Sequence, residues 1–239
     1  NMSSFTSCKK VELHLHLEGA ASPHLVRDIC KSSGTQIPEI FDKAGNYNWQ
    51  NFDQFLAIYE IVTNIFSDEK NFEVLVRHVL DRQVKENVIY NEIFLGPHLW
   101  SDRPNYQWER FLNIASKVAN EYKKKYGIYT YFIIVCIRHL GPEKALEASR
   151  FASTVKDKNV VGFGMAGDET KFNTLDFVTS FDFAKSAGLG TTSHAGEICG
   201  AKSVDEAIKL GVTRIGHGVR SCESEETIIN LSKKNILLE

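Results

Sequence analysis

The sequence lacks the usual features of disulfide-bonded and membrane-spanning proteins. Only five cysteines occur among 239 residues, and none lies in a C-x-x-C pair. An odd, scattered set argues against a disulfide framework and for a reducing compartment. The longest apolar runs, such as residues 129–137, are too short to span a bilayer, and residues 1–10 lack the apolar core of a signal peptide. We therefore expect a cytoplasmic protein without a membrane partner.

An excess of charge of either sign is also lacking. The formal net charge is -2, with 24% charged and 43% hydrophobic residues, which is ordinary for a soluble globular protein. Without a broad basic face, nucleic acid is not an expected partner. We interpret the run Lys123-Lys124-Lys125 as a solvated helix end. The length of 239 residues suits one large domain, and we predict a single domain over residues 1–239.

Strand-like apolar runs alternate with segments of helical periodicity. We predict strands at residues 11–16, 88–95, 129–137, 160–166, 190–194, 213–217 and 236–239. We predict helices at residues 51–66, 73–87, 142–154, 175–187, 204–210 and 223–234. Repeated strand-then-helix order implies a parallel sheet covered by helices. The continuous apolar run at residues 129–137 is typical of a strand buried on both faces.

An open doubly wound sheet and a closed (β/α)8 barrel both fit this order. The positions of His14, His16, His194 and His217 favour the barrel, because they fall at the carboxyl ends of three well-separated predicted strands. A barrel brings such strand ends to one site. We therefore predict an α/β fold of the TIM-type (β/α)8 barrel. The amphipathic segment 51–66 lies in a connection too long for a simple crossover, and we predict that it forms part of a lid.

Three of these histidines suggest a metal site. His14 and His16 are two residues apart in a predicted strand, so their side chains point to the same face. His194 would supply a third nitrogen from a distant strand. Three protein ligands with an open position are typical of a metal ion that activates water. The alternative is that the histidine pair consists of ordinary surface or core residues.

Two further residues at strand ends suggest proton transfer. Glu197 follows His194 by three residues, where a carboxyl group can act as general acid or base, although a first-turn helix acid is the alternative. His217 lies between two glycines at a strand end, which suits a side chain exposed to a pocket, although a loop-capping histidine is the alternative. Gly167 could bring its backbone against a flat ligand. Asp168 and Glu169, which follow it, are equally well explained as loop or helix-start acids.

Four strings, in this order and at these separations, resemble bacterial-type adenosine deaminase of the metal-dependent amidohydrolase superfamily. They are Val11-Glu-Leu-His14-Leu-His16-Leu-Glu18-Gly19, Ala166-Gly167-Asp168-Glu169, His194-Ala195-Gly196-Glu197-Ile198-Cys199-Gly200 and Arg214-Ile215-Gly216-His217-Gly218-Val219-Arg220. The resemblance extends over nearly the whole chain. It implies zinc-dependent hydrolytic deamination of adenosine and deoxyadenosine to inosine and ammonia in purine salvage, with a small purine nucleoside as substrate. It leaves the oligomeric state open.

The resemblance also implies a role for each residue. His14, His16 and His194 would bind one zinc ion per chain, Glu197 would protonate the purine at N1, and His217 would orient the attacking water and help to deprotonate it. Gly167 would contact the purine at N3. The remaining substrate-binding positions would be His16, Glu18, Phe52, Phe55, Leu56 and Tyr59, with the last four lining the apolar lid.

One departure from the family pattern leaves the substrate open. Glu18 stands where adenosine deaminases often have an aspartate that binds the ribose 5'-hydroxyl, whereas related adenine deaminases often carry glutamate there. The string Gly-Pro97-His98-Leu99 resembles the nucleoside enzymes more, so adenosine is the first expectation. The alternative is an adenine deaminase or a deaminase of modified adenosines.

A second departure lies at the C-terminus. In the family, the seventh strand continues and an eighth strand carries an Asp-Asp pair that binds zinc and purine. This sequence stops at Leu237-Leu238-Glu239, within predicted strand seven, so we expect that the C-terminal part of the domain is missing. The corresponding non-enzyme alternative is an inactive, truncated paralogue that binds purine.

Overall fold

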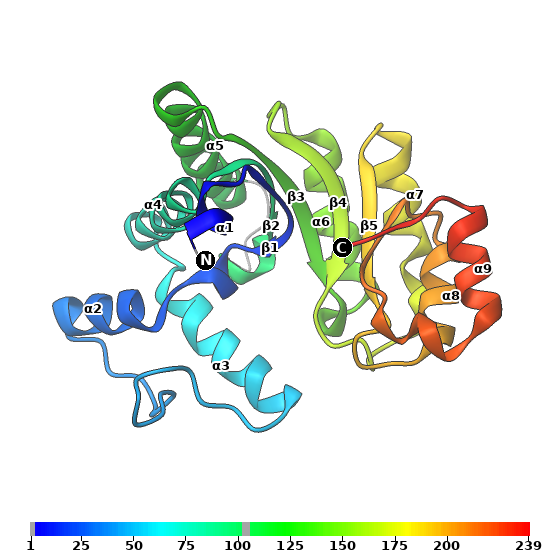
Figure 1. The fold of residues 1–239 in the computed structure, drawn as a ribbon, viewed down its shortest axis with the longest axis horizontal. Coiled ribbons are helices and arrows are strands. Elements are labelled where there is room, and N and C mark those ends of the chain that lie inside the picture. Colours follow the sequence, from blue (N-terminus) through cyan, green and yellow to red (C-terminus); the bar gives the residue numbers. More distant parts are fainter. Residues whose placement is uncertain (1–2, 102–105) are drawn as a thin grey trace. The chain divides into compact units, whose positions relative to one another are not determined.

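The computed structural model describes residues 3–101 and 106–239, and strands alternate with helices along them (Figure 1). The strands are β1 (Lys10–His16), β2 (Val88–Leu95), β3 (Tyr129–Ile137), β4 (Val160–Ala166), β5 (Gly190–Ala195), β6 (Arg214–His217) and β7 (Leu237–Leu238). The α-helices are α1 (Ser3–Ser7), α2 (Pro23–Ser33), α3 (Phe52–Ile65), α4 (Glu69–Lys85), α5 (Tyr106–Tyr126), α6 (Pro142–Thr154), α7 (Val178–Ser186), α8 (Ala201–Lys209) and α9 (Glu225–Lys233). Short 3-10 helices are η1 (Glu18–Ala20), η2 (Pro97–Leu99), η3 (Arg138–Leu140), η4 (Thr174–Phe177) and η5 (Val219–Glu223).

The order of the strands decides between the two predicted α/β architectures. Within the described residues, one seven-stranded sheet runs from β1 to β7 in chain order, and each pairing from β3 to β7 is parallel. A doubly wound sheet reverses its strand order at a switch point, whereas a (β/α)8 barrel keeps chain order. The predicted TIM-type class is therefore confirmed, with seven barrel-type strands in the part of the chain that is described.

Local sequence signals account for most element boundaries. Strands β2, β3 and β4 and helix α6 have the predicted bounds, while the predicted helix at 175–187 is divided into η4 and α7. Helices α1, α2 and α5 were not predicted. Helix α2 has clear local causes, because the Ser22 side chain accepts a hydrogen bond from the Leu25 N–H, Pro23 occupies the first turn, and Gly34 ends the helix in a left-handed conformation.

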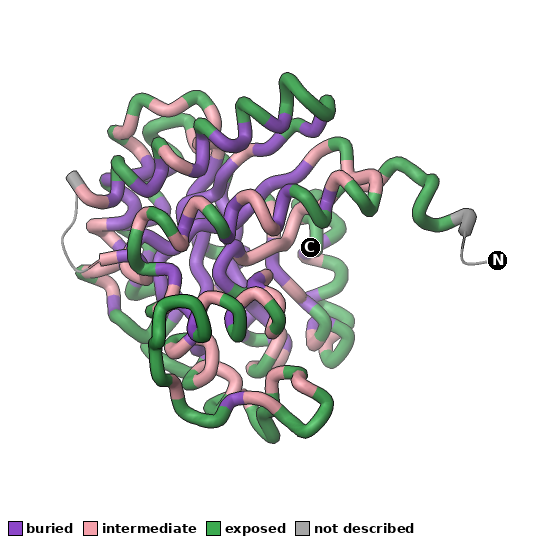
Figure 2. The backbone as a smooth tube through the Cα atoms, turned by 90° about the vertical axis from the view of Figure 1, so that its left-hand side faces the viewer, coloured by how far each residue is buried: buried purple, intermediate pink, exposed green. Residues whose placement is uncertain are grey.

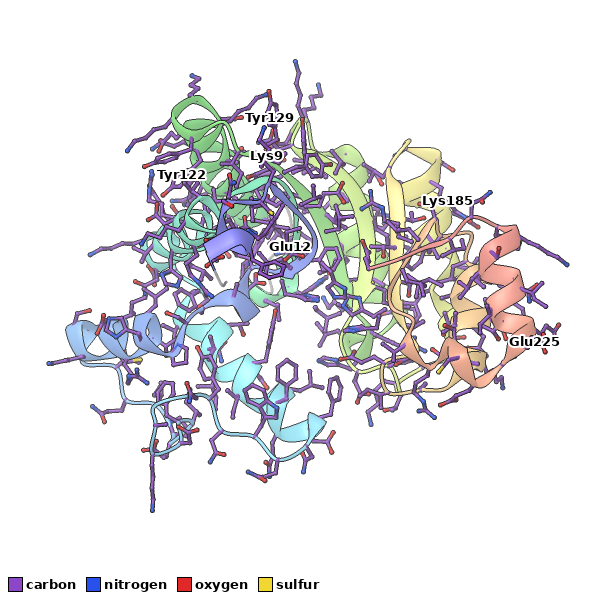
Figure 3. The ribbon with its side chains drawn as sticks, viewed as in Figure 1. Lys9, Glu12, Tyr122, Tyr129, Lys185 and Glu225 are labelled. Carbon is purple, nitrogen blue, oxygen red and sulfur yellow. The ribbon has the colours of Figure 1, made fainter. Side chains whose placement is uncertain are left out.

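The chain divides into two compact units. The first unit comprises residues 1–93 and 99–130, and the second comprises residues 94–98 and 131–239. An aromatic cluster forms much of the first unit's core: the ring centroid of Phe72 lies 5.4 Å from that of Trp100 and 4.9 Å from that of Phe111. In the same unit, the Tyr122 hydroxyl of α5, labelled in Figure 3, donates to Asp81 of α4 at 2.5 Å. The single domain expected over the whole chain stays a prediction.

The second unit is built on buried strands. Phe94, Ile133, Val135 and Ala166 form one apolar cluster, and most residues of β3, β4 and β5 are buried. Figure 2 draws buried residues in purple. Helix α7 packs on α6 and also on β4 and β5. Lys185 of α7, labelled in Figure 3, donates to the Leu210 carbonyl at 2.8 Å. Among the described residues, we find no helix whose length and hydropathy would let it cross a bilayer.

Candidate active site

In the first unit, β1 ends with the predicted pair of histidines. The ring centroids of His14 and His16 lie 5.4 Å apart, with an angle of 61° between the ring planes. The two rings are therefore neighbours, as expected for residues i and i+2 on one face of a strand. The His14 N–H donates to the Glu12 carboxylate at 2.9 Å, which helps to hold the end of the strand. Their role as metal ligands stays a prediction.

Glu18, just after β1, lies in a buried polar cluster of the first unit. Its side chain is only 2% exposed, and the indole N–H of Trp100 donates to its carboxyl at 2.9 Å. Burial raises the pKa of Glu18 to about 7, although hydrogen bonds from the backbone, Trp100 and Tyr59 oppose this effect. The pKa of Tyr59 is also raised, first by burial and then by the neighbouring Glu18. The structure thus brings together two of the predicted substrate-binding residues, Glu18 and Tyr59.

The other predicted lid residues continue this cluster along α3. The ring centroids of Phe52 and Phe55 are 5.8 Å apart, and those of Phe55 and Tyr59 are 6.0 Å apart. These three rings and Leu56 are neither fully buried nor fully exposed. The helix begins at Asn51, whose side chain accepts a hydrogen bond from the Gln54 N–H. An aromatic face of this kind can cover a flat ligand, although its role stays a prediction.

In the second unit, His194 and His217 come together at the ends of adjacent strands. Residue Ala195 of β5 pairs with His217 of β6, and the two imidazole centroids lie 5.2 Å apart. Ligand atoms of these two rings lie within 4.8 Å of each other. His194 is 7% exposed. Imidazole nitrogens at this spacing fit the donor set of a zinc ion. Of these two residues, the sequence predicts His194 as a metal ligand, together with His14 and His16, and His217 as a catalytic residue.

His217 has an unusual backbone conformation. Its φ is +70°, in the left-handed region that a residue with a side chain rarely adopts. Gly218 follows with φ of +64° and donates its N–H to the Ala195 carbonyl at 2.9 Å. Strained conformations of this kind cluster at functional sites, where surrounding contacts hold them. The Nε2 atom of His217 lies 3.3 Å from the Oε2 atom of Glu197.

The surroundings of Glu197 favour the protonated form of its carboxyl. Burial raises its pKa, and the negative charge of Glu169 raises it further. A carboxyl with a raised pKa beside an imidazole can donate a proton to a ligand and later take one back. These properties agree with the predicted role of Glu197, which itself stays a prediction.

Gly167, Asp168 and Glu169 follow β4. The sequence predicts a backbone contact from Gly167 and leaves Asp168 and Glu169 open as loop or helix-start acids. Gly167 has φ of +104°, and a Cβ atom there would lie 2.9 Å from the His139 Nδ1. Its backbone can therefore lie close to its neighbours only because it has no side chain. The adjacent Asp168 N–H donates to the His139 Nδ1 at 3.2 Å. Asp168 is a loop acid, as one alternative proposed, because it accepts hydrogen bonds from the backbone and hydroxyl of Thr170.

Glu169 is the residue whose position sequence reasoning missed. It is only 4% exposed and accepts hydrogen bonds from residues of the segment that carries Glu197. These partners lie 27 to 34 residues further along the chain. No local pattern in the sequence pairs positions that far apart, so only the folded chain reveals this contact.

The strand order and the side chains at the strand ends are those of an α/β protein of the barrel type, with imidazoles and a carboxyl whose pKa is raised. A model of the adenosine deaminase family matches residues 9–239. This chain belongs to the adenosine deaminase family. The family is part of the amidohydrolase superfamily. The relatives of this chain include proteins named adenine deaminase.

Three relatives define the similarity further. An adenine deaminase of Chelativorans sp. (strain BNC1) is 36% identical over 231 residues, covering 96% of this chain and 70% of the relative. The crystal structure of an adenine deaminase from Arthrobacter aurescens superposes with a TM-score of 0.85 at 25% identity, covering 95% of this chain and 70% of that one. An amidohydrolase from Burkholderia ambifaria, solved with bound Zn, shares the fold with a TM-score of 0.84 at 20% identity, covering 99% of this chain and 66% of that one. The family assignment makes this chain a purine deaminase by descent.

Proposed function

We propose that this protein hydrolyses the exocyclic amine of free adenine to give hypoxanthine and ammonia. The sequence motifs favour adenosine as the substrate. The similarity to adenine deaminases at 36% identity supports adenine instead. The structural observation that carries the choice is the position of Glu18. Its carboxyl is buried and hydrogen-bonded to Trp100, so a ribose hydroxyl would have to displace an existing contact to reach it. Free adenine has no ribose, so it can bind without displacing this hydrogen bond.

Zinc is the proposed cofactor, with His14, His16 and His194 as its ligands. The near-complete burial of His194 and the adjacent imidazole of His217 support a metal at this strand end. When bound, zinc would lower the pKa of a water molecule to about 7 and so supply hydroxide at neutral pH. The chain's own residues would then have to bind the base and move the protons.

Glu197 and His217 are the proposed proton carriers. Glu197 donates its proton to the purine N1 while the water oxygen bonds to C6, and His217 takes one proton from that water. The C6–N6 bond then breaks, and the nitrogen leaves as ammonia with the proton from His217. The remaining hydroxyl proton at C6 returns to Glu197, which leaves the C6 carbonyl of hypoxanthine. The 3.3 Å distance between Glu197 Oε2 and His217 Nε2 supports this shared role.

Gly167 and the aromatic face of α3 are the proposed contacts to the flat base. Because Gly167 has no side chain, its backbone could contact N3 without a clash. Phe52, Phe55, Leu56 and Tyr59 would supply apolar surface against the ring, and excluding water there strengthens the electrostatic contacts. His16 would contact both metal and substrate.

Turnover of adenine against adenosine tests the proposal. The protein of the complete gene, loaded with zinc, should give kcat/KM for adenine at least about 10²-fold above that for adenosine, measured by ultraviolet absorbance. A preference for adenosine would show that the choice of base over nucleoside is wrong. Binding of adenine without turnover of either compound would instead support the inactive purine-binding alternative.

Two variants test the proposed site. Glu197→Gln keeps the shape of the side chain but cannot donate the same proton, so kcat should fall by about 10²–10⁴-fold with zinc content unchanged. His14→Ala should lose stoichiometric zinc in elemental analysis. Retention of full zinc and activity by His14→Ala would remove that residue from the metal site.

A further inference from the structure

The carboxylate of Glu169 accepts five hydrogen bonds from one short segment of the second unit. Its Oε1 accepts from the Gly196 N–H and from the Ser203 hydroxyl, both at 2.5 Å. Its Oε2 accepts from the N–H groups of Glu197 at 3.1 Å, Ile198 at 2.8 Å and Cys199 at 3.0 Å. Four consecutive N–H groups thus converge on one carboxylate, which is the arrangement of a backbone anion-binding nest.

The convergence requires a particular backbone at the start of the segment. Gly196 has φ of +72°, and a Cβ atom there would lie 2.7 Å from the Val204 side chain. Glycine therefore allows the turn that directs the four N–H groups of residues 196–199 inward. Because Glu169 is only 4% exposed, water cannot easily replace it as their acceptor. Without that carboxylate, the four N–H groups would lack an acceptor at the point on which they converge.

Glu197 is tied to this nest through its own main chain. Its N–H donates to Glu169, while its side chain reaches the His217 imidazole 3.3 Å away. Glu169 thus holds the main chain of Glu197, and His217 lies next to its carboxyl group. A shift of the segment would move the carboxyl relative to the base it must protonate, and displacements of about 1 Å at a catalytic group can cost about 10²-fold in rate.

We propose that Glu169 is a positioning residue for the deamination reaction, which acts by holding residues 196–199 so that the Glu197 carboxyl is aligned with its substrate. Glu169 itself does not touch the base. The proposal rests on the proposed function, since it needs Glu197 as the acid. It goes beyond that function because Glu169 is not among the residues proposed to bind the metal or the substrate or to move protons.

Glu169→Gln tests the proposal most directly. The glutamine amide would present N–H donors where N–H donors already converge, so the nest would open while the side-chain volume is kept. We expect kcat for adenine to fall about 10²-fold, with KM and zinc content little changed. Glu143→Gln is the matched control, since it removes an exposed carboxylate in the first turn of α6 in the same unit and should leave kcat unchanged. An unchanged kcat in folded Glu169→Gln would overturn the proposal.

A double-mutant cycle separates positioning from general structural support. If Glu169 acts through Glu197, adding Glu169→Gln to Glu197→Gln should change kcat only a few-fold further, because the aligned proton is already gone. Full additivity of the two effects would overturn the proposal. If Glu197→Gln does not lower kcat, Glu197 is not the acid and the proposed function is wrong. That outcome differs from full additivity, which contradicts only the positioning role of Glu169.

Ser203→Ala tests the positioning role of Glu169 if the Glu169→Gln protein does not fold. It removes one of the five donors and leaves the carboxylate in place. We expect kcat to fall several-fold in the wild-type background and not at all in the Glu197→Gln background. An equal fall in both backgrounds, or none in either, would contradict the positioning role.

Discussion

Glu18 in the first unit and Glu169 in the second are both buried acids just past the end of a strand, yet their pKa values shift in opposite directions. Glu18 is 2% exposed and its pKa is raised to about 7, first by burial. Glu169 is 4% exposed, and its pKa is lowered, because hydrogen bonds from Ser203 and the backbone outweigh the effect of burial. The balance between desolvation and hydrogen-bond donors decides the direction in which each pKa shifts.

The difference explains what each acid can do within its own unit. A carboxylate that stays ionised can organise backbone N–H groups and raise the pKa of a neighbouring acid, as Glu169 does for Glu197. A carboxyl with a pKa of about 7 is mostly neutral at pH 6, where it can lie beside Trp100 and Tyr59 without a cation to balance it. Substitutions that remove the charge should therefore affect the two positions very differently.

The largest expected effect is on stability at pH 6. Glu169→Gln should lower the free energy of unfolding by roughly 3–5 kcal/mol, since it leaves buried donors without their charged acceptor. Glu18→Gln should not lower it and should raise it by up to about 2 kcal/mol, because the wild-type acid must bind a proton to fold at pH 6, whereas glutamine, with nearly the same shape, need not. Urea unfolding of both variants measures the difference. Similar losses at the two positions would refute the contrast between them.

The pH dependence of stability should differ in sign. Glu18 has a raised folded pKa, so the folded state holds its proton more tightly. The stability it contributes is therefore fully present below the unfolded pKa of 4.5 and is lost as pH rises toward 7, by roughly 3 kcal/mol in all. Glu169 has a lowered folded pKa, so its contribution is present above 4.5 and is lost as pH falls through the lower folded value.

Urea midpoints of the zinc-free protein between pH 3 and pH 8 measure both effects. Glu18→Gln should abolish the loss of stability between about pH 4.5 and 7 and leave the acid-side loss in place. Glu169→Gln should do the reverse. If Glu18→Gln has the same pH profile as the wild type over that window, Glu18 is ionised in the fold and its proposed environment is wrong.

The smallest expected effect concerns the single donor to Glu18 from Trp100. Trp100→Phe keeps the ring in the aromatic cluster with Phe72 and Phe111 but removes the indole N–H. The free energy of unfolding should fall by about 1 kcal/mol, the usual contribution of one hydrogen bond. The pKa of Glu18 should rise further, because the Trp100 hydrogen bond lowers it. Infrared absorption of the protonated carboxyl would follow that change.

The sequence was a good guide where structure depends on neighbours along the chain. The bounds of β2, β3 and β4 follow from runs of apolar, β-branched and aromatic residues, and the alternation of strands and helices was enough to expect a parallel α/β sheet. The neighbouring rings of His14 and His16 follow from the two-residue period of a strand. Helix α5 was missed, with only its lysine-rich end interpreted as helical.

Tertiary structure alone decided how the buried acids are used. Glu18 meets Trp100 across 82 residues of sequence, and Glu169 meets residues 27 to 34 positions away. Sequence reasoning assigned Glu18 to the substrate and treated Glu169 as a possible loop acid, because residue type and local spacing do not specify distant donors. A carboxyl's protonation state depends on those donors and on desolvation, and both are set only when distant segments within each unit fold together.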